Sequence, residues 1–311
     1  MAPDLAVDLL FVVAGIAGLW FGADQFVTGA TRLAHRLGVS GLVIGLTVVS
    51  FGTSAPEFAV TVDAALTAKA DISVGNVVGS NVVNLGFVLG GTALVRRLPV
   101  APDLVRRDGA IMVGSVLLLL VVLRDGTVAR VEGVLLVVLL VGYLVLLVRS
   151  DADDASRRVE TSEFRRTDLL RLGGGLAVVV AAAHALVSGA ASAAAALGVS
   201  EWAIGVTVVA LGTSTPELVT SLAAAYRGRA NLAAGNVVGS CIFNIFGVLG
   251  LAAVLRSLPV AGAAVRGTLW LVGMAVVATA LLWTRRALTG PEGALLVALN
   301  AVHWIGDLLG W

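Results

Sequence analysis

The sequence predicts an all-α polytopic membrane protein with ten transmembrane helices, arranged as two inverted repeats of five helices each. Three observations support this fold class: the composition, an internal repeat and the distribution of the basic residues. Of the 311 residues, 58% are hydrophobic and only 13% are charged, and the mean hydropathy is +0.99. An average soluble domain is about 25% charged. We therefore expect an integral membrane protein whose surroundings are lipid, with no nucleic-acid partner.

The apolar runs are long enough to cross a bilayer, which takes about 20 residues per helix. We expect spans at about 6–33, 40–68, 73–96, 107–123, 129–148, 168–193, 200–226, 232–255, 266–284 and 291–309. The segment 149–167 is dense in charges of both signs and is predicted to be a cytoplasmic linker. It divides the chain into a first five-helix repeat, 1–148, and a second, 168–311.

The two halves are related by one constant offset, which places position 41 on position 201. Without a gap, 28 of the 60 residues in 41–100 are identical to those in 201–260. "GTSAPE" falls on "GTSTPE", and "GNVVGS" at 75–80 falls on "GNVVGS" at 235–240. A repeat of this size indicates a duplicated helical unit.

The basic residues predict how the chain crosses the membrane, because cytoplasmic loops carry an excess of Lys and Arg. Taken alternately, the loops on one side hold sixteen basic residues and those on the other side hold five. We expect the richer side in the cytoplasm, both termini outside, and the plasma membrane as the location. Five spans per half make the second half enter the membrane in the opposite sense. Such inverted repeats are typical of secondary transporters with a mid-membrane site.

One glutamate lies in the middle of an apolar span in each half: Glu57 and Glu217. The pattern Ser-x-x-Glu at Ser54 and Ser214 predicts a helix capping box, in which the Ser hydroxyl caps the helix and the Glu reaches back to a free amide. Within a membrane this means that the second and seventh helices break and restart. A carboxylate at that depth costs about 2.5 kcal/mol or more, so two in equivalent positions favour a cation site over capping alone.

The predicted ligands are all oxygen atoms, which suits Ca²⁺ with its 6–8 ligands. No His or Cys pair has the spacing of a soft-metal site. Two carboxylates neutralise one Ca²⁺ or two Na⁺, so one cage could hold either ion. The next span of each half adds Ser and Asn four residues apart on one helix face. The candidate metal ligands are Glu57, Glu217, Ser54, Ser214, the carbonyls of Thr53 and Thr213, Ser80, Ser240, Asn84 and Asn244.

The glycines of the two "GNVVGS" segments have a simpler interpretation. They recur every four residues, at 75, 79, 235 and 239, and predict close helix packing.

These motifs resemble the two alpha-repeats of the calcium/cation antiporter superfamily, and the closest branch looks like the prokaryotic sodium/calcium exchangers. The resemblance covers nearly the whole chain. It implies four cation positions between the second, third, seventh and eighth helices, with Ca²⁺ on the two glutamates and the Thr carbonyls. It implies that Na⁺ uses the same glutamates with the serines and the backbone at Ser50 and Ala210. It also implies that the first and sixth helices slide as a gating pair.

One residue departs from the pattern of the resembling archaeal exchangers, which carry Asp at the position of Asn244. An amide there removes a titratable group and brings the number of Na⁺ ions, and the dependence on Na⁺, into question.

We therefore expect a secondary antiporter that exchanges Na⁺ for Ca²⁺, with a Ca²⁺/H⁺ antiporter of the same superfamily as the alternative. The acidic pair after "GN" that proton-coupled members carry is absent, which favours Na⁺. A cation channel and an intramembrane enzyme are less well supported, since the chain lacks a filter motif and a nucleophile–base pair. No cofactor is expected beyond the transported Ca²⁺ and Na⁺, and the chain is expected to act as a monomer.

Overall fold

The computed structural model describes residues 5–153, 166–196, 210–260 and 262–309. The regular secondary structure of these residues is helical, apart from four two-residue strands, and short turns connect the elements. The elements of the first half are α1 (Leu5–Leu37), α2 (Gly41–Ile44), η1 (Gly45–Val49), α3 (Ser50–Thr53), α4 (Ala55–Leu66), α5 (Ala70–Val83), η2 (Asn84–Gly90), α6 (Gly91–Val95), β1 (Leu98–Pro99), η3 (Leu104–Asp108), α7 (Gly109–Val122), η4 (Leu123–Asp125), β2 (Thr127–Val128) and α8 (Arg130–Asp153). Of these, η1, η2 and η3 are π-helical turns and η4 is a 3₁₀ turn.

The described part of the second half repeats this order, except that a single helix, α15, stands in place of η3, α7 and η4. Its described elements are α9 (Arg166–Ala196), α11 (Ala210–Thr213), α12 (Thr215–Tyr226), α13 (Ala230–Phe243), the π-helical η7 (Asn244–Leu249), α14 (Gly250–Leu255), β3 (Leu258–Pro259), α15 (Gly262–Arg285), β4 (Ala287–Leu288) and α16 (Gly290–Leu309). Helices α12 and α13 begin and end at the repeat mates of the first and last residues of α4 and α5. The sequence repeat is thus a repeat of helices.

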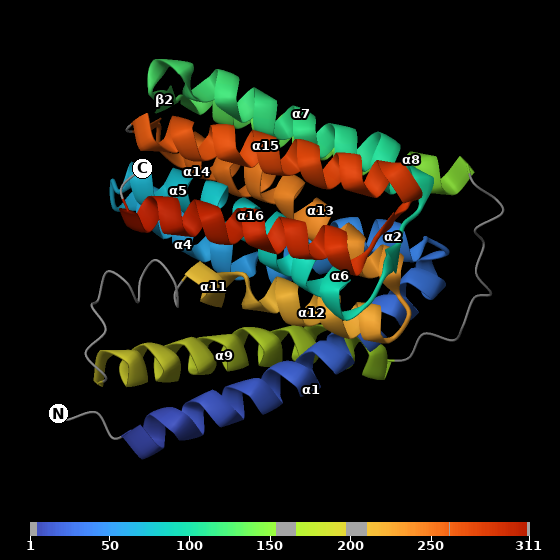
Figure 1. Cartoon of the computed structure of the whole chain (residues 1–311). Helices are drawn as coiled ribbons and strands as arrows, with labels where there is room; N and C mark the ends of the chain where they lie inside the picture. Colours follow the sequence, from blue (N-terminus) through green and yellow to red (C-terminus); the bar gives the residue numbers. More distant parts are fainter. Residues whose placement is uncertain (1–4, 154–165, 197–209, 261, 310–311) are drawn as a thin grey trace.

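Equivalent helices run in opposite directions. In Figure 1, α1 runs from left to right and its mate α9 from right to left. Helix α7 runs from right to left and its mate α15 from left to right. The chain therefore begins α1 and ends α16 at the same end of the molecule.

The membrane-spanning character of the helices agrees with the apolar composition. Among the described residues, six helices are long and apolar enough to cross a bilayer: Val7–Leu37, Ala70–Val95, Arg130–Ser150, Arg166–Leu186, Ala230–Leu255 and Ala264–Arg285. Gly41–Thr53 and Ala55–Leu66 are together long and apolar enough as well, with a bend of 50° at their break, and make a seventh if the pair is counted as one span. The spans expected at 107–123 and 291–309 correspond to helices α7 and α16. Part of the span expected at 200–226 lies outside the described residues, so the count of ten stays a prediction.

Helices α5 and α13 form the centre of the bundle. They are largely buried, whereas α1, α8 and α9 expose most of their apolar side chains, as a lipid-facing helix does. Helices α1 and α9 pack along each other on one flank (Figure 1). Small residues allow this close contact: a Cβ added to Gly18 would lie 2.8 Å from the Cβ of Ala182.

Two short antiparallel ribbons join the halves at opposite ends of the bundle. Strand β1 pairs with β4, and β2 pairs with β3, so that each ribbon takes one strand from each half. The offset of the sequence repeat maps β1 onto β3 and β2 onto β4, which makes the ribbons equivalent. The two halves are therefore joined by main-chain strand pairing in addition to the packing of their helices.

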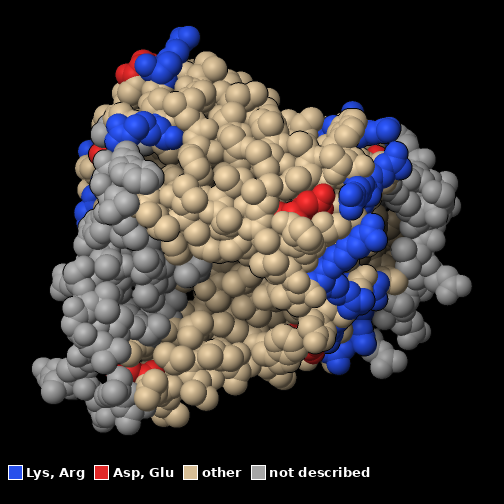
Figure 2. Space-filling model, in the orientation of Figure 1, with Lys and Arg blue, Asp and Glu red and all other residues tan. Residues whose placement is uncertain are grey.

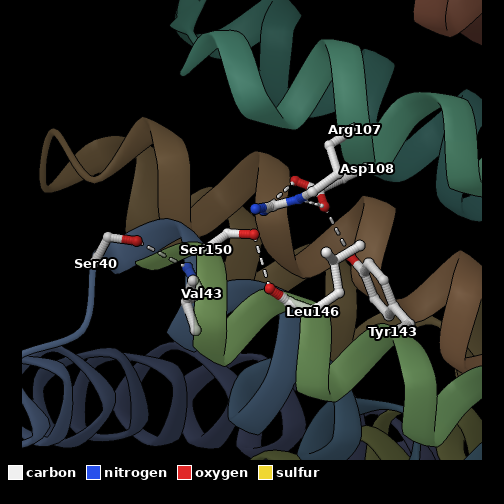
Figure 3. Close-up of polar contacts among 7 residues, drawn as sticks. All are labelled: Ser40, Val43, Arg107, Asp108, Tyr143, Leu146 and Ser150. Carbon is white, nitrogen blue, oxygen red and sulfur yellow. Dashed lines mark hydrogen bonds and ion pairs between the residues drawn. The ribbon is translucent and has the colours of Figure 1, made fainter. Parts of the chain in front are cut away.

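A tyrosine hydroxyl of α8 bonds an ion pair that lies just before the start of α7 (Figure 3). The Arg107 guanidinium donates to both carboxylate oxygens of Asp108, at 2.8 and 3.0 Å, and the Tyr143 hydroxyl donates to Asp108 at 3.2 Å. Asp108 is fully buried, so these partners replace the water that it has lost. In the same view, Ser40 caps α2 by accepting a hydrogen bond from the Val43 amide at 3.2 Å.

Candidate functional site: a buried pair of glutamates

Glu57 and Glu217 lie at equivalent places, in the first turns of α4 and α12. Each helix begins just after a serine, Ser54 or Ser214, at which the preceding helical turn ends. A proline stands within the first two positions of each helix, where its missing amide proton is not needed. Both glutamate side chains are fully buried, although they belong to spans that the composition assigns to the membrane.

The two halves exchange hydrogen bonds at this point. Ser54 Oγ donates to Glu217 Oε1 at 2.9 Å, and Ser214 Oγ donates to Glu57 Oε1 at 3.2 Å. Each serine thus bonds the glutamate of the other half. These crossed bonds place both carboxylates at one contact between the halves.

The predicted capping box is therefore wrong in its hydroxyl bond. Ser54 and Ser214 stand at the N-cap positions, but neither side chain caps its own helix. A capping serine would turn its oxygen toward an amide of its own helix and accept a hydrogen bond from it. Here each hydroxyl instead points to the carboxylate of the other half and donates to it, a charge-assisted bond that is stronger than a neutral one.

The second oxygen of each carboxylate lacks a hydrogen-bond partner among the described residues. Among the residues that the structure describes, Glu57 Oε2 and Glu217 Oε2 are buried and have no hydrogen-bond partner. The same is true of both polar atoms of Asn84 and of Asn244 Oδ1. Burial of unpaired polar atoms, and of charged ones above all, is unfavourable. A small cation that these oxygens coordinate would remove the penalty.

The other predicted ligands take several positions. Ser240 Oγ lies 3.5 Å from Glu217 Oε1, and its repeat mate Ser80 is buried on α5. Thr53 is buried, whereas Thr213 is half-buried and takes part in a polar interaction. The Ser50 hydroxyl donates within the protein, to the carbonyls of Gly45 at 2.6 Å and Asn236 at 3.0 Å. Ala210 begins α11.

Asn84 and Asn244 begin the π-helical turns η2 and η7. A π-helical turn inserted into an α-helix often marks a functional site, since it redirects a side chain and disturbs the backbone bonding. Neither of these candidate ligands bonds a glutamate among the described residues. Asn244 Nδ2 donates to Asn81 Oδ1 at 3.1 Å, and Asn84 has no partner within the described residues.

Two further asparagines hold the glutamate turns and were not singled out from the sequence. Asn76 Nδ2 donates to the main-chain carbonyl of Glu57 at 3.2 Å, and Asn236 Nδ2 lies 3.4 Å from that of Glu217. The same amides donate to the hydroxyls of Thr61 at 2.9 Å and Ser221 at 3.0 Å. The signal was present: each is the Asn of a "GNVVGS" segment, a polar residue repeated within an apolar span.

The donor set at this place is one of hard oxygens. Within the described part of the chain, no group of three or more His, Cys, Asp or Glu side chains could hold a metal ion. The carboxylates of Glu57 and Glu217, the amide oxygens and the hydroxyls suit a cation such as Ca²⁺ or Na⁺ better than a thiophilic metal.

The sequence model of the family described as "Sodium/calcium exchanger protein" matches residues 7–149 and 168–303. The chain belongs to the sodium/calcium exchanger family. The two matched blocks leave out the charged segment between them.

Relatives of this exchanger extend over most of its length. It is 35% identical to "Sodium/calcium exchanger MaX1" of Methanosarcina acetivorans, over 83% of this chain and 85% of that one. It is 38% identical to "Putative antiporter CaxA" of Alkalimonas amylolytica, over 81% and 82% of the two chains. It is 33% identical to "Inner membrane protein YrbG" of Escherichia coli (strain K12), over 98% and 99%.

The fold of the exchanger matches a solved structure of the same kind. The sodium-calcium exchanger NCX_Mj, soaked without Na⁺ and Ca²⁺, superposes with a TM-score of 0.85 at 32% identity, over 98% of this chain and 99% of that one. The protein is thus an all-α polytopic membrane protein and an antiporter of the sodium/calcium exchanger type. It is a transporter and not an enzyme.

Proposed function

We propose that this exchanger moves Ca²⁺ across the membrane in exchange for Na⁺, and that both ions use the site between Glu57 and Glu217. The observation that carries the proposal is the pair of buried carboxylates, each bonded to the serine of the other half and each with one oxygen unpaired among the described residues. Two negative charges match one Ca²⁺ or two Na⁺, so the ions compete for the same oxygens. The relatives whose names mention sodium and calcium support this choice of ions.

We assign the ligands by type. Ca²⁺ takes Glu57 and Glu217 with the main-chain carbonyls of Thr53 and Thr213. Na⁺ takes the same carboxylates with oxygens from the serines and from the backbone at the ends of the preceding turns. The asparagines that begin η2 and η7 supply their amide oxygens to either ion. The remaining members of this proposed set are Ser50, Ser54, Ser80, Ala210, Ser214, Ser240, Asn84 and Asn244.

The packing of α1 and α9 supports a mechanism of alternating access. These two helices contact each other along most of their length and lie at the edge of the bundle, next to α12 (Figure 1). We propose that they slide as a unit over the two glutamate turns and open the site to one side at a time. An empty site carries two uncompensated carboxylates, and their desolvation opposes sliding until cations neutralise them. This provides the coupling.

The same proposal covers the architecture and the location. We propose ten spans in two inverted halves joined by the 149–167 linker, with both glutamate turns breaking a helix. One chain supplies both carboxylates, so a monomer suffices for the site. Figure 2 shows Lys and Arg at both ends of the molecule, with most of them along the right-hand end, opposite the end where α1 begins and α16 ends. Following the positive-inside rule, we assign this more basic end to the cytoplasm of a plasma-membrane protein, with both termini outside.

The coupling ion is tested with purified exchanger in proteoliposomes. An outward Na⁺ gradient is expected to drive uptake of radioactive Ca²⁺, and its collapse with a sodium ionophore should stop the uptake. A pH gradient in sodium-free buffer is the parallel measurement. Uptake that follows only the pH gradient would reject Na⁺ coupling and identify a Ca²⁺/H⁺ antiporter. Flux that does not saturate and needs no counter-ion would point to a channel.

The orientation is tested with reporters fused to the C-terminus in a bacterial host. Because α16 ends opposite the basic end, we expect an alkaline phosphatase fusion to be active and a green fluorescent protein fusion to be dark. The inverse result would contradict the assignment of the basic end to the cytoplasm. A fusion placed in the 149–167 linker should give the opposite pattern and serves as the control.

A further inference from the structure

We propose that Asn81 is a positioning residue, which fixes the side-chain amide of Asn244 so that its oxygen faces the transported cation. The inference deepens the proposed function and rests on it. Asn81 lies on α5 and Asn244 begins η7, so the contact joins the two halves of the exchanger. Both side chains are fully buried, where hydrogen bonds are strong and where unpaired groups are unfavourable.

The orientation of the two amides follows from one main-chain group. The Asn81 side chain lies 3.1 Å from the main-chain carbonyl oxygen of Cys241. A carbonyl oxygen can only accept a hydrogen bond, so the atom of Asn81 that faces it must be the NH₂ group. The direction of a main-chain carbonyl is set by the helix, unlike the orientation of a side-chain amide, which is assigned from its hydrogen bonds.

The orientation of the Asn244 amide is determined in the same way. With its NH₂ on Cys241, Asn81 turns Oδ1 toward Asn244, at a distance of 3.1 Å. An amide oxygen also only accepts, so Asn244 must present its NH₂ there. Asn244 Oδ1 then points away from Asn81, and it is one of the buried oxygens without a partner in the described chain. The reversed amide would offer N–H groups to a cation, which repel it.

The repeat gives an internal comparison. The offset between the halves takes Asn244 to Asn84 and Asn81 to Cys241. In place of an amide, the second position therefore carries a thiol, which is only a weak donor and acceptor. Both polar atoms of Asn84 are without a partner among the described residues. The exchanger thus has one amide ligand that is held in orientation and one that is not, although the two halves have the same asparagine.

The test measures the apparent KM for Ca²⁺ and the maximal uptake rate of proteoliposomes with Asn81→Leu, a substitution that removes both hydrogen bonds and keeps the branched shape of the side chain. We expect the KM to rise on the order of tenfold, because the Asn244 amide loses its partner and its fixed orientation. Cys241→Ala is the matched control. It keeps the main-chain carbonyl and should have an unchanged KM.

A double-mutant cycle separates positioning from a merely structural role. If Asn81 acts through Asn244, Asn81→Leu should add nothing to the KM of Asn244→Leu. An equal rise in both backgrounds, or a wild-type KM for Asn81→Leu, would overturn the inference. If Asn81→Leu does not fold, as judged by thermal unfolding in detergent, Asn81→Ser takes its place with the same expectations. Persistent Ca²⁺ uptake by Glu217→Gln would instead overturn the proposed function itself, so the two failures are distinguishable.

Discussion

Replacing Glu57 or Glu217 by Gln is expected to abolish coupled Ca²⁺ uptake, with a loss of at least about 100-fold in each case. Gln keeps the size and the oxygen that accepts from serine, but it removes one of the two buried charges. A single carboxylate cannot neutralise Ca²⁺, and the NH₂ of the new amide would face the cation or lose its partners. The measurement is uptake of radioactive Ca²⁺ by proteoliposomes under the gradient that drives the wild type.

The matched control for this change is Glu132→Gln. Glu132 lies at the start of α8, away from the glutamate pair, and its Oε2 accepts a hydrogen bond from the Ala129 amide at 2.8 Å. Gln keeps an oxygen for that bond, so uptake should stay close to that of the wild type. If both site variants transported Ca²⁺ as well as Glu132→Gln does, the glutamate pair could not be the cation site.

Gly239→Ala is expected to destabilise the exchanger by about 1–3 kcal/mol, because an overfilled helix contact forces the backbone to move. A Cβ at this position of α13 would lie 2.7 Å from the Cα and 2.8 Å from the carbonyl oxygen of Leu46, and would also meet the Ser50 hydroxyl. These are mostly backbone atoms, which cannot turn aside as the end of a long side chain can. The change should lower the unfolding temperature in detergent and reduce transport.

Gly142→Ala provides the comparison for this second change. Gly142 lies on an exposed part of α8, and an added Cβ meets no atom of the described chain within 4 Å. Alanine is the better helix former, so this variant should unfold at or slightly above the wild-type temperature. Equal unfolding temperatures for the two variants would mean that α13 and η1 are not in close contact.

The glycine repeat illustrates what a sequence motif leaves open. Both "GNVVGS" segments predict close helix packing, and Gly239 and Gly235 do pack against the segment 42–50. For their mates Gly75 and Gly79, an added Cβ meets nothing within 4 Å among the described residues. The helix segment equivalent to 42–49, which is 202–209, lies outside the described residues, so the packing of these two glycines stays a prediction.

Much of the fold could be predicted from residue patterns. The polytopic class follows from apolar runs that only a bilayer can accommodate, and the repeat follows from identities between the halves at one constant offset. The positions of Glu57 and Glu217 as buried charges follow from the same patterns, since a carboxylate within an apolar span needs a partner. Proline and serine before each glutamate also predict the restart of a helix, which the structure has at Ala55 and Thr215.

Pairing within the site could not be predicted in this way. The sequence by itself determined which residues are equivalent between the halves, because one constant offset aligns each residue with its mate. Only the tertiary structure decided that Ser54 bonds Glu217 rather than its own helix, that Asn76 and Asn236 hold the glutamate turns, and that Asn81 reaches Asn244. The physical reason is that these contacts join residues from opposite halves of the chain, or from different helices of one half. Local conformational preferences reflect only residues that are close in sequence. These hydrogen bonds form only when the folded chain brings distant buried polar groups together.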